Sequence, residues 1–445
     1  MNTQTTIAGV TFKNPVMTAS GTFGSGMEYE EFVDLNRLGA VVTKGVANVP
    51  WPGNPTPRVA EVYGGMLNAI GLQNPGIDVF MERDIPFLKK YDTKIIVNVC
   101  GKTVEDYVDV VERLGDEPAV SMLEINVSCP NVKEGAIAFG QKADALYNIT
   151  SELKNHAKQP IIMKLSPNVT DITEMAKAAE AAGADALSLI NTITGMKIDI
   201  HRRKFAIDMW IATDLAEQAK AGQFIGVYPK DRSTLLPRPI SICQVSDKKD
   251  ALRIVYRIAG QGTAEFSSYT EGDSVEILGT LGNGFPTEAA EGKKVFLMGG
   301  GIGIPPMLEL ARELPASAEK QIIVGYRDNQ LFLKEDLEEN GTVYIATEDG
   351  SVGTKGNVMN AIEENALQAD VIFACGPMPM LRAIKKYAEE KEIKAYISLE
   401  EHMACGVGAC LGCVVKTKEV DHHSHVHNAR ICTDGPVFDA EEVEI

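Results

Sequence analysis

The segment GMKIDIHRRKFAIDMWIATDLAEQ, residues 195–218, separates two parts of the chain that have different sequence patterns. Before it, short apolar runs rich in Val and Ile alternate with longer amphipathic stretches, which predicts βα repeats around a buried parallel sheet. After it, short β-rich runs follow at close spacing, separated by Gly, Pro and Asp, which predicts a small antiparallel barrel. The segment is not rich in Gly, Ser or Pro, so it is not typical of a flexible linker. The chain is therefore predicted to join two different architectures directly.

Length and composition favour a multidomain protein that acts on small molecules. The 445 residues suffice for about three domains of roughly 150 residues each. The formal net charge of −18 argues against nucleic acid or an anionic membrane as the main partner, because both are held by excess Lys and Arg. The N-terminus has no basic start followed by an apolar run, and no segment approaches the ~18 apolar residues that span a bilayer, so a cytoplasmic location is expected.

Polar residues end the apolar runs of the first part. The six runs are VMTAS (16–20), AVVTKG (40–45), IIVNVC (95–100), LEINVSC (123–129), IIMKLS (161–166) and ALSLIN (186–191). Near their carboxyl ends lie Ser20, Lys44, Asn98, Asn126, Lys164 and Asn191. In a βα-barrel these ends form the mouth where chemistry takes place. The lysines would hold a substrate carboxylate and an anionic reduced flavin, and the asparagines would pair with the C=O and N–H groups of a flat ring such as a pyrimidine.

Cys129 lies just beyond the fourth run, where Pro130 keeps the backbone extended. A thiol, whose usual pKa is about 8.5, can serve as a base at neutral pH if nearby cations favour the thiolate. An isolated cysteine is more often a small buried packing residue. Its position at a rim of lysines and asparagines favours a catalytic role.

Residues 1 to about 204 resemble the catalytic subunit of dihydroorotate dehydrogenase, particularly the NAD-dependent B form. The resemblance is carried by ASGTFG (19–24), TKGV (43–46), NAIGLQN (68–74), INVSCPN (125–131), MKLSPN (163–168) and INTITGMKID (190–199). It implies an incomplete TIM (β/α) barrel, because the family has eight strands and the glycine-rich segments after the last two, which grip the FMN phosphate, have no counterpart here.

The same resemblance implies a set of site residues. FMN contacts are expected from Ser20, Lys44, Gly45, Asn98, Asn126, Lys164 and Ile190. Orotate contacts are expected from Lys44, Asn68, Ala69, Ile70, Gly71, Leu72, Asn126, Asn191 and Thr192. Cys129 matches the family's base, which removes the C5 proton of the substrate while hydride leaves C6 for the flavin.

The second part begins with the barrel runs FIGVYP (224–229), RPISICQV (238–245), LRIVYRIAG (252–260) and SVEILGTLG (274–282). The stretch KKVFLMGGGIGIPPMLELARELP (293–315) then predicts a strand, a glycine turn and a helix, an arrangement that favours a pyrophosphate at the helix N-terminus. A glycine turn of this kind is a weak signal alone. The runs QIIVGY (321–326), TVYIAT (342–347) and DVIFAC (370–375) strengthen it, because they predict a doubly wound domain in which CGPMPM (375–380) ends a strand at the ligand crevice.

Four cysteines near the C-terminus have the spacing of an iron–sulfur site. Cys405-x4-Cys410-x2-Cys413, with Cys432 eighteen intervening residues later, matches the plant-type [2Fe–2S] pattern, whereas zinc sites usually pair two short spacings. The intervening glycines leave backbone N–H groups free to face sulfide. The run HHSHVH (422–427) suggests a second metal, but histidines in a polar loop are more often solvated, and a metal needs ligands of fixed geometry.

Residues 207–445 resemble the ferredoxin reductase superfamily, most closely the electron-transfer subunit of the same B-type enzyme. The resemblance rests on the barrel run that begins with Arg238 and on the Cys-Gly-Pro strand end. It implies FAD contacts from Arg238, Pro239, Ile240, Ser241, Ile254, Val255, Tyr256, Gly262 and Thr263, and nucleotide contacts from Gly299, Gly300, Gly301, Gly303, Cys375, Gly376 and Pro377. Tyr256 could equally be an ordinary strand aromatic, and the Arg327-Asp328 pair leaves NAD and NADP both open.

Together these patterns predict four domains: a partial dehydrogenase barrel (1–204), an FAD-binding β-barrel (207–288), an NAD-binding domain (289–395) and a [2Fe–2S] segment (396–445). The expected function is NAD-dependent oxidation of dihydroorotate to orotate in pyrimidine biosynthesis, with electrons passing from FMN through the cluster and FAD to NAD⁺. The alternatives are an electron-transfer flavoprotein with an inert first part, or a joined sequence that never folds fully. In the family the two parts are separate chains of a heterotetramer, so intact subunits of that enzyme are expected partners.

Overall fold

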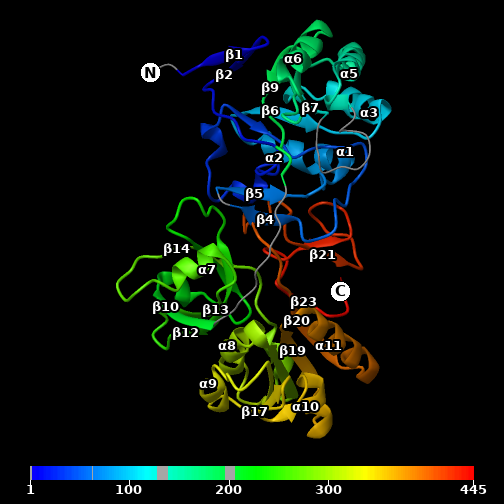
Figure 1. The fold of residues 1–445 in the computed structure, drawn as a ribbon. Helices are drawn as coiled ribbons and strands as arrows, with labels where there is room; N and C mark the ends of the chain where they lie inside the picture. Colours follow the sequence, from blue (N-terminus) through cyan, green and yellow to red (C-terminus); the bar gives the residue numbers. More distant parts are fainter. Residues whose placement is uncertain (1–2, 63, 128–138, 196–205) are drawn as a thin grey trace.

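The structure, a computed structural model, describes residues 3–62, 64–127, 139–195 and 206–445. A curled parallel sheet with helices occupies one end of the molecule, and an antiparallel sheet and a nucleotide-type sheet occupy the other (Figure 1). The C-terminal segment lies between them, beneath the hairpin of β4 (Val59–Val62) and β5 (Gly65–Asn68). Within the described residues, no helix has the length and apolar character needed to cross a bilayer.

The first part is an open half-barrel of five parallel strands in the order β3, β6, β7, β8, β9. Its core lies between the sheet and the helices, and it is filled by Val, Ile and Leu side chains. A capping box of Thr103 and Asp106 starts one of these helices, and Asp171 caps another. The elements are β3 (Ala40–Val42), α1 (Gly76–Val79), α2 (Ile85–Leu88), β6 (Lys94–Val99), α3 (Val104–Gly115), β7 (Val120–Asn126), α5 (Ala143–His156), β8 (Ile161–Lys164), α6 (Ile172–Ala181) and β9 (Ala186–Ser188).

The run at 16–20, predicted to be the first strand, does not form one. A single parallel bridge joins Met17 to Ala40, and the chain turns at Ser20. Pro15, which cannot donate a backbone hydrogen bond, precedes the run, and its partner β3 is only three residues long. The two preceding strands, β1 (Thr5–Ile7) and β2 (Val10–Phe12), form a separate hairpin. The half-barrel sheet therefore has five strands rather than six.

The second part opens with an antiparallel sheet in the order β10, β13, β12, β11, β14. The strand β10 (Ala206–Ala212), which was not among the predicted runs, pairs along its whole length with β13 (Ala251–Arg257). The remaining strands are β11 (Phe224–Tyr228), β12 (Arg238–Val245) and β14 (Glu276–Leu281), and the short helix α7 (Gln261–Phe266) follows β13. The second half of the joining segment is thus the edge strand of this sheet.

A parallel nucleotide-type sheet follows, in the order β18, β17, β16, β15, β19, β20, with β23 added antiparallel at one edge. Its central strand β15 (Lys294–Gly300) lies between β16 (Glu319–Tyr326) and β19 (Val371–Cys375), so the strand order reverses at β15. The other elements are α8 (Pro305–Glu313), α9 (Lys334–Glu338), β17 (Thr342–Thr347), β18 (Thr354–Lys355), α10 (Val358–Glu364), α11 (Met378–Lys391), β20 (Lys394–Ser398), β21 (Val414–Thr417), β22 (Asn428–Arg430), β23 (Val437–Asp439) and β24 (Val443–Glu444). Because β23 comes from the C-terminal segment, the cluster segment is built onto this sheet.

Candidate active site and cluster-binding loop

A buried carboxylate organises the mouth of the half-barrel. Glu124, in the middle of β7, is 5% exposed. Its side chain accepts hydrogen bonds from Asn98 Nδ2 at 2.6 Å and Ser188 Oγ at 2.8 Å, and Lys164 Nζ lies 3.5 Å away. Lys164 also lies 3.4 Å from Ser20 Oγ. Four neighbouring segments of the half-barrel are therefore tied to one anion.

The asparagines form a second row of contacts. Asn126 Nδ2 donates to Asn98 Oδ1 at 3.3 Å, and Asn191 Nδ2 donates to Asn126 Oδ1 at 2.8 Å. The carbonyl of Asn126 accepts from Tyr107 Oη at 2.7 Å, which fixes the end of β7. The structure thus gathers five of the six predicted rim residues into one polar network that also contains Glu124.

Lys44, the sixth rim residue, faces the C-terminal segment. Its Nζ lies 3.5 Å from the carbonyl of Ala409, next to the predicted cluster ligand Cys410, and burial lowers the pKa of Lys44. A Cβ at Gly45 would lie 3.2 Å from Asn98 Oδ1, so the backbone at this position faces the amide network closely. A flat ring bound at the mouth would meet backbone there instead of a side chain.

The loop of residues 68–74 lies beside Gly45, and it is called the substrate loop because it contains the predicted orotate contacts from Asn68 to Leu72. Asn54 donates to the carbonyls of Ala69 and Ile70, each at 3.0 Å, which holds the loop. Gly71 has φ +77°, and Leu72 has φ +53°, so the loop turns sharply before Gln73. The Leu72 side chain reaches within 3.5 Å of the Cβ position of Gly45. The loop therefore borders the mouth.

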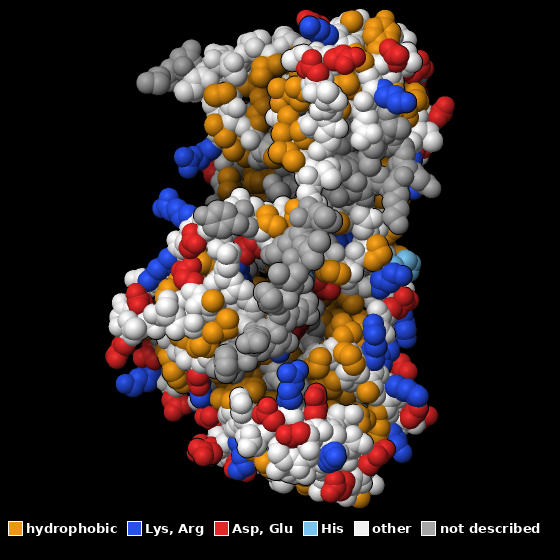
Figure 2. Space-filling view, in the orientation of Figure 1, with side chains coloured by type: hydrophobic (Ala, Val, Ile, Leu, Met, Phe, Trp, Pro, Cys, Tyr) orange, Lys and Arg blue, Asp and Glu red, His pale blue; other side chains and the backbone are white. Residues whose placement is uncertain are grey.

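The remaining predicted residues near the half-barrel mouth are Thr192, Ile190 and Cys129. Thr192 follows β9, and its carbonyl accepts from Asn168 Nδ2 at 2.9 Å. Ile190 is 45% exposed at the open edge of the sheet. Cys129 lies outside the described residues, three positions beyond the last residue of β7. Figure 2 shows apolar side chains gathered over the half-barrel, where Leu187, Leu189, Ile190 and Ile193 are exposed.

The side chains of the four C-terminal cysteines lie close together and are joined by hydrogen bonds. Cys410 N donates to Cys405 Sγ at 3.4 Å, and Gly412 N donates to Cys410 Sγ at 3.4 Å. Hydrogen bonds from Cys410 and Cys432 lower the pKa of Cys405, whereas the bond with Cys405 raises the pKa of Cys410 and of Cys432. Thiolate sulfurs that receive backbone N–H groups suit a [2Fe–2S] cluster. Among the described residues, no three His, Cys, Asp or Glu side chains are placed to hold a single metal ion, the histidine run included.

The cluster loop, residues 405–413, is docked on the half-barrel through Arg58. This residue is 2% exposed and donates to Gln73 Oε1 at 2.6 Å, to the carbonyl of Leu411 at 3.0 Å and to the carbonyls of Pro52 and Asn54. Burial lowers the pKa of Arg58 to about 10. A Cβ at Gly412 would lie 2.9 Å from Val59, so the loop and β4 meet without space between them. The substrate loop and the cluster loop therefore share one guanidinium.

The predicted FAD residues gather on the antiparallel sheet, with one unexpected partner. A Cβ at Gly262 would lie 2.5 Å from Arg238 Nε, so these two residues are in contact. Arg238 pairs with Glu61 of the half-barrel hairpin, with Nη1 3.1 Å from Oε1. The Tyr256 hydroxyl is buried and has no hydrogen-bond partner in the described part of the chain, and burial raises the pKa of Tyr256 to about 12. The guanidinium of Arg238, in contact with Gly262, suits a diphosphate-containing cofactor, because it is planar and permanently charged.

The two predicted nucleotide loops meet at the reversal point of the parallel sheet. A Cβ at Gly303 would lie 2.4 Å from the carbonyl of Cys375, and one at Gly300 would lie 2.5 Å from Met380 Sδ. Burial raises the pKa of the Cys375 thiol, so this cysteine stays protonated. The close approach of the glycine turn to the Cys-Gly-Pro strand end matches the crevice expected at such a point.

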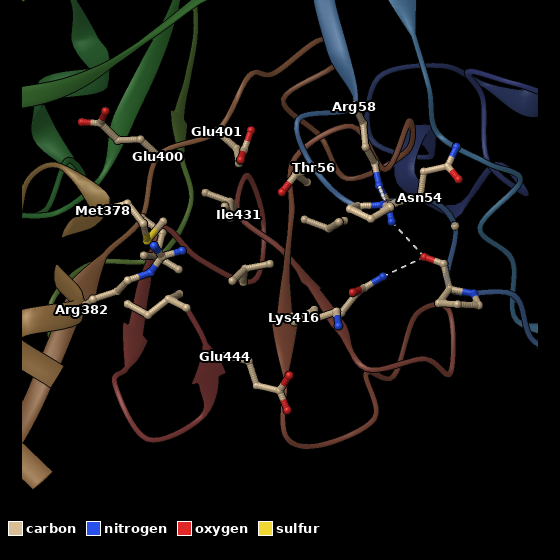
Figure 3. A pocket seen from close by; sticks show the side chains of 18 residues that line it. Asn54, Thr56, Arg58, Met378, Arg382, Glu400, Glu401, Lys416, Ile431 and Glu444 are labelled. Atoms are coloured by element: carbon tan, nitrogen blue, oxygen red, sulfur yellow. Dashed lines mark hydrogen bonds between the residues drawn. The ribbon is translucent and has the colours of Figure 1, made fainter. Parts of the chain in front are cut away.

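A separate cavity of about 470 Å³ lies where the half-barrel, the nucleotide-type sheet and the C-terminal segment meet (Figure 3). It is lined by the loop around Thr56 and Arg58, the first turns of α11 with Arg382, and β21 with Lys416. Glu401 also lines it, so charges of both signs surround the space.

Sequence reasoning missed Glu124, Arg58 and Glu61. A charged residue inside the otherwise apolar run LEINV was a usable signal for Glu124, because a strand buried on both faces tolerates a carboxylate only with partners. Arg58 and Glu61 lie in a segment without periodicity, and their partners across the interface, Leu411 and Arg238, lie 353 and 177 residues further along the chain. Only the folded structure brings them to the interface.

The variant Glu124→Gln is expected to destabilise the half-barrel by roughly 1–3 kcal/mol, because one amide N–H₂ would face the donors of Asn98 or Ser188 and the Lys164 charge would lose its partner. A lower urea midpoint at unchanged slope would show this. Glu112→Gln is the matched control: Glu112 is 57% exposed on α3, so its change should stay within about 0.5 kcal/mol. Equal midpoints for both variants would contradict the central role of Glu124.

The half-barrel has a mouth lined by lysine and asparagine, and it is docked on a four-cysteine loop and a nucleotide-type sheet. This combination defines an iron–sulfur oxidoreductase. Residues 2–212 match the dihydroorotate dehydrogenase family, and residues 400–444 match the iron–sulfur cluster binding domain of dihydroorotate dehydrogenase B. The chain belongs to the family of dihydroorotate dehydrogenase B (NAD(+)) catalytic subunits, and it carries in addition the cluster-binding domain of that enzyme.

Individual relatives show how far the likeness extends. The catalytic subunit of Lachnoclostridium phytofermentans is 64% identical over 269 residues, which is 60% of this chain and 89% of that protein. The subunit of Alkaliphilus metalliredigens is 64% identical over 204 residues, covering 46% and 67%, and that of Alkaliphilus oremlandii is 65% identical over 198 residues, covering 44% and 65%. A solved NADH-dependent reduced ferredoxin-NADP oxidoreductase overlays with a TM-score of 0.48 at 26% identity, covering 57% of this chain and 91% of that one.

Proposed function

We propose that this chain oxidises dihydroorotate to orotate in pyrimidine biosynthesis and passes the electrons from FMN through a [2Fe–2S] cluster and FAD to NAD⁺. The observation that carries the proposal is the docking of the cluster loop on the half-barrel mouth, where Lys44 Nζ lies 3.5 Å from the carbonyl that precedes Cys410. An electron leaving a flavin at this mouth would have the cluster as its neighbour. The flavins supply hydride chemistry and the cluster supplies single-electron transfer when they are bound.

The residues of the chain have assigned roles in this proposal. Lys44, Gly45, Asn98, Asn126 and Lys164 would hold the FMN ring, and the substrate loop with Asn191 would hold the pyrimidine. Cys129 would remove the C5 proton. The residues of β12 and β13 with Gly262 would bind FAD, and the loops after β15 and β19 would bind the pyridine nucleotide. The carboxylate of Glu124 would keep Lys164 and Asn98 in place without touching the substrate.

The proposal also covers the domain boundaries, the partners and the cellular location of the chain. We assign the four units to 1–204, 207–288, 289–395 and 396–445, and we expect intact subunits of the same enzyme as partners. All seven described cysteines are free, which fits a reducing cytoplasm.

A second candidate is an electron-transfer flavoprotein whose half-barrel is catalytically inert. The exposed Leu187, at 41%, and Leu189, at 67%, favour it, because an apolar edge is a liability in a complete enzyme. In that case the second part alone would carry activity.

Quantification of cofactors and half-reactions separates the two candidates. The purified chain is expected to release FMN and FAD in equal amounts after acid precipitation, with two iron and two sulfide per chain. Anaerobic dihydroorotate should bleach the flavin spectrum, and NADH should reduce a dye. Release of FAD without FMN, together with a spectrum that dihydroorotate leaves unchanged, would refute the first candidate and support the second.

A further inference from the structure

A buried carboxylate with one free oxygen lies at the interface between the half-barrel and the cluster segment. Glu28, in the short 3₁₀ helix at Met27–Tyr29, has a side chain that is 7% exposed. Its Oε1 lies 2.7 Å from His423 Nε2, whereas Oε2 is buried and has no hydrogen-bond partner within the described residues. A buried carboxylate oxygen without a partner is costly unless water or a transferable proton satisfies it.

The space beside this carboxylate leads toward the mouth. A cavity of about 10 Å³ is lined by Glu28, Gly24, Lys44 and Ala409, among others. That volume matches one water molecule. A Cβ at Gly24 would lie 2.3 Å from Glu28 Oε2, and the carbonyl of Gly24 accepts from Lys44 N at 2.8 Å. The cavity therefore connects the free oxygen of Glu28 with the lysine at the mouth.

The partner of the other oxygen reaches the surface. The His423 side chain is 18% exposed, which gives it access to solvent, while its Nδ1 is held 2.9 Å from Oγ of the buried Ser424. Imidazole nitrogens both donate and accept, so histidine passes protons between a buried group and solvent. This residue belongs to the histidine run of the sequence, and its side chain contacts Glu28 of the half-barrel.

The charges around the pair favour an ionised acceptor. Burial opposes ionisation, but the hydrogen bond and charge of His423 and the charge of Lys44 outweigh it, so the pKa of Glu28 is lowered. The groups that face the pair from the packed elements are Tyr29, Lys44, Arg83, Asp84, Asp421, Asp434 and Arg430. Arg83 donates to the carbonyl of His423 at 2.6 Å, which fixes the loop against the half-barrel.

We propose that the water-sized cavity, Glu28 and His423 form the exit by which protons leave the substrate site; this rests on the proposed function. Conversion of dihydroorotate to orotate breaks the C5–H and C6–H bonds and forms the C5=C6 double bond, which removes two electrons and two protons. In the proposed function the electrons would leave singly through the cluster, which carries no hydrogen. NAD⁺ takes two electrons and one proton at the other end, so one proton is released overall. Two protons must therefore leave the half-barrel in each turnover.

The test uses the full chain loaded with both flavins and the cluster. Glu28→Gln and His423→Asn should slow proton release, followed with a pH-indicator dye during anaerobic reaction with dihydroorotate, by about tenfold or more. They should also raise the solvent deuterium isotope effect on turnover. His423→Ala should regain rate when imidazole is added, which a purely structural role would not allow.

The matched control is His425→Asn, in the same loop. His425 is exposed and has φ +52°, which Asn tolerates, so this variant should keep the wild-type rate and isotope effect. Iron content and dye reduction by NADH should stay unchanged in all four variants.

The outcomes separate the two levels of the proposal. If the wild type oxidises dihydroorotate and both Glu28→Gln and His423→Asn match it in rate and isotope effect, the proton exit is refuted while the proposed function stands. If dihydroorotate leaves the wild type unbleached, the proposed function fails. The exit is then judged by anaerobic reduction of the bound FMN with NADH, which draws protons into the same site, and equal rates in wild type and variants would refute it.

Discussion

Cys129→Ser is expected to reduce dihydroorotate oxidation to about 10⁻²–10⁻⁴ of the wild-type rate, because a hydroxyl is a far weaker base than a thiolate and a positioned base contributes a factor of this size. The cysteine follows β7, whose end is fixed by the bond from Tyr107 Oη to the carbonyl of Asn126 at 2.7 Å. Lys164 ends β8, the neighbour of β7, and Lys44 follows β3, which lies two strands from β7 in the same sheet. Both cations would favour a thiolate near the end of β7.

Half-reactions measure this prediction. Dihydroorotate-driven flavin bleaching should be lost in Cys129→Ser, whereas NADH-to-dye electron transfer, which the proposed function assigns to the second part alone, should stay near the wild-type rate. FMN content should be unchanged, since other residues are proposed to hold the ring. Loss of both activities to the same extent would mean that the base is a different residue.

The architecture of each part could be predicted because periodicity and strand-end chemistry are local properties of the sequence. Lys44, Asn98 and Lys164 were predicted to share a mouth because the carboxyl ends of parallel strands meet at one edge. In the structure Asn98 and Lys164 both contact Glu124, whereas Lys44 turns toward Ala409 of the C-terminal segment. The run at Val16 failed as a strand because pairing depends on the partner's length and on Pro15, which an apolar pattern does not reveal.

The contacts between the two parts could not be predicted from the sequence. Arg238 was expected to face a diphosphate, and in the structure it pairs with Glu61, which is 177 residues away. His423 was weighed only as a metal ligand or a solvated residue, and it bonds Glu28 across 395 residues. Such contacts arise from docking of preformed surfaces, and neither propensity nor spacing encodes which charged residues will face each other.

Arg58→Met is expected to lower stability by roughly 3–5 kcal/mol and to uncouple the two parts. The guanidinium is 2% exposed, and its removal leaves Gln73 Oε1 and the carbonyls of Leu411, Pro52 and Asn54 without their donor. Figure 3 shows Arg58 reaching from the half-barrel toward the C-terminal segment. At about 2–4 °C per kcal/mol, Tm should fall by roughly 6 °C or more.

Arg58→Met is expected to impair electron transfer between the two parts more than it impairs folding. The cluster loop would lose its tie to Gln73 of the substrate loop, so dihydroorotate-to-NAD⁺ transfer should fall at least tenfold at a temperature where the variant is still folded. Dihydroorotate-driven bleaching of FMN and NADH-driven dye reduction should each persist, because the proposed function assigns each of them to one part only. Arg58→Lys should restore little, since an ammonium cannot reproduce the planar fork that reaches two loops.

Arg113→Met is the matched control for this variant, because Arg113 pairs with Asp78 on the exposed surface of the same half-barrel. A surface pair contributes about 0–1 kcal/mol, so stability and electron transfer should be nearly unchanged. If Arg58→Met kept wild-type transfer between the parts while its half-reactions were intact, the guanidinium would not be the coupling element. The docking would then depend on the apolar contact of Val59 with Gly412 and on the bonds from Arg83 to the histidine loop.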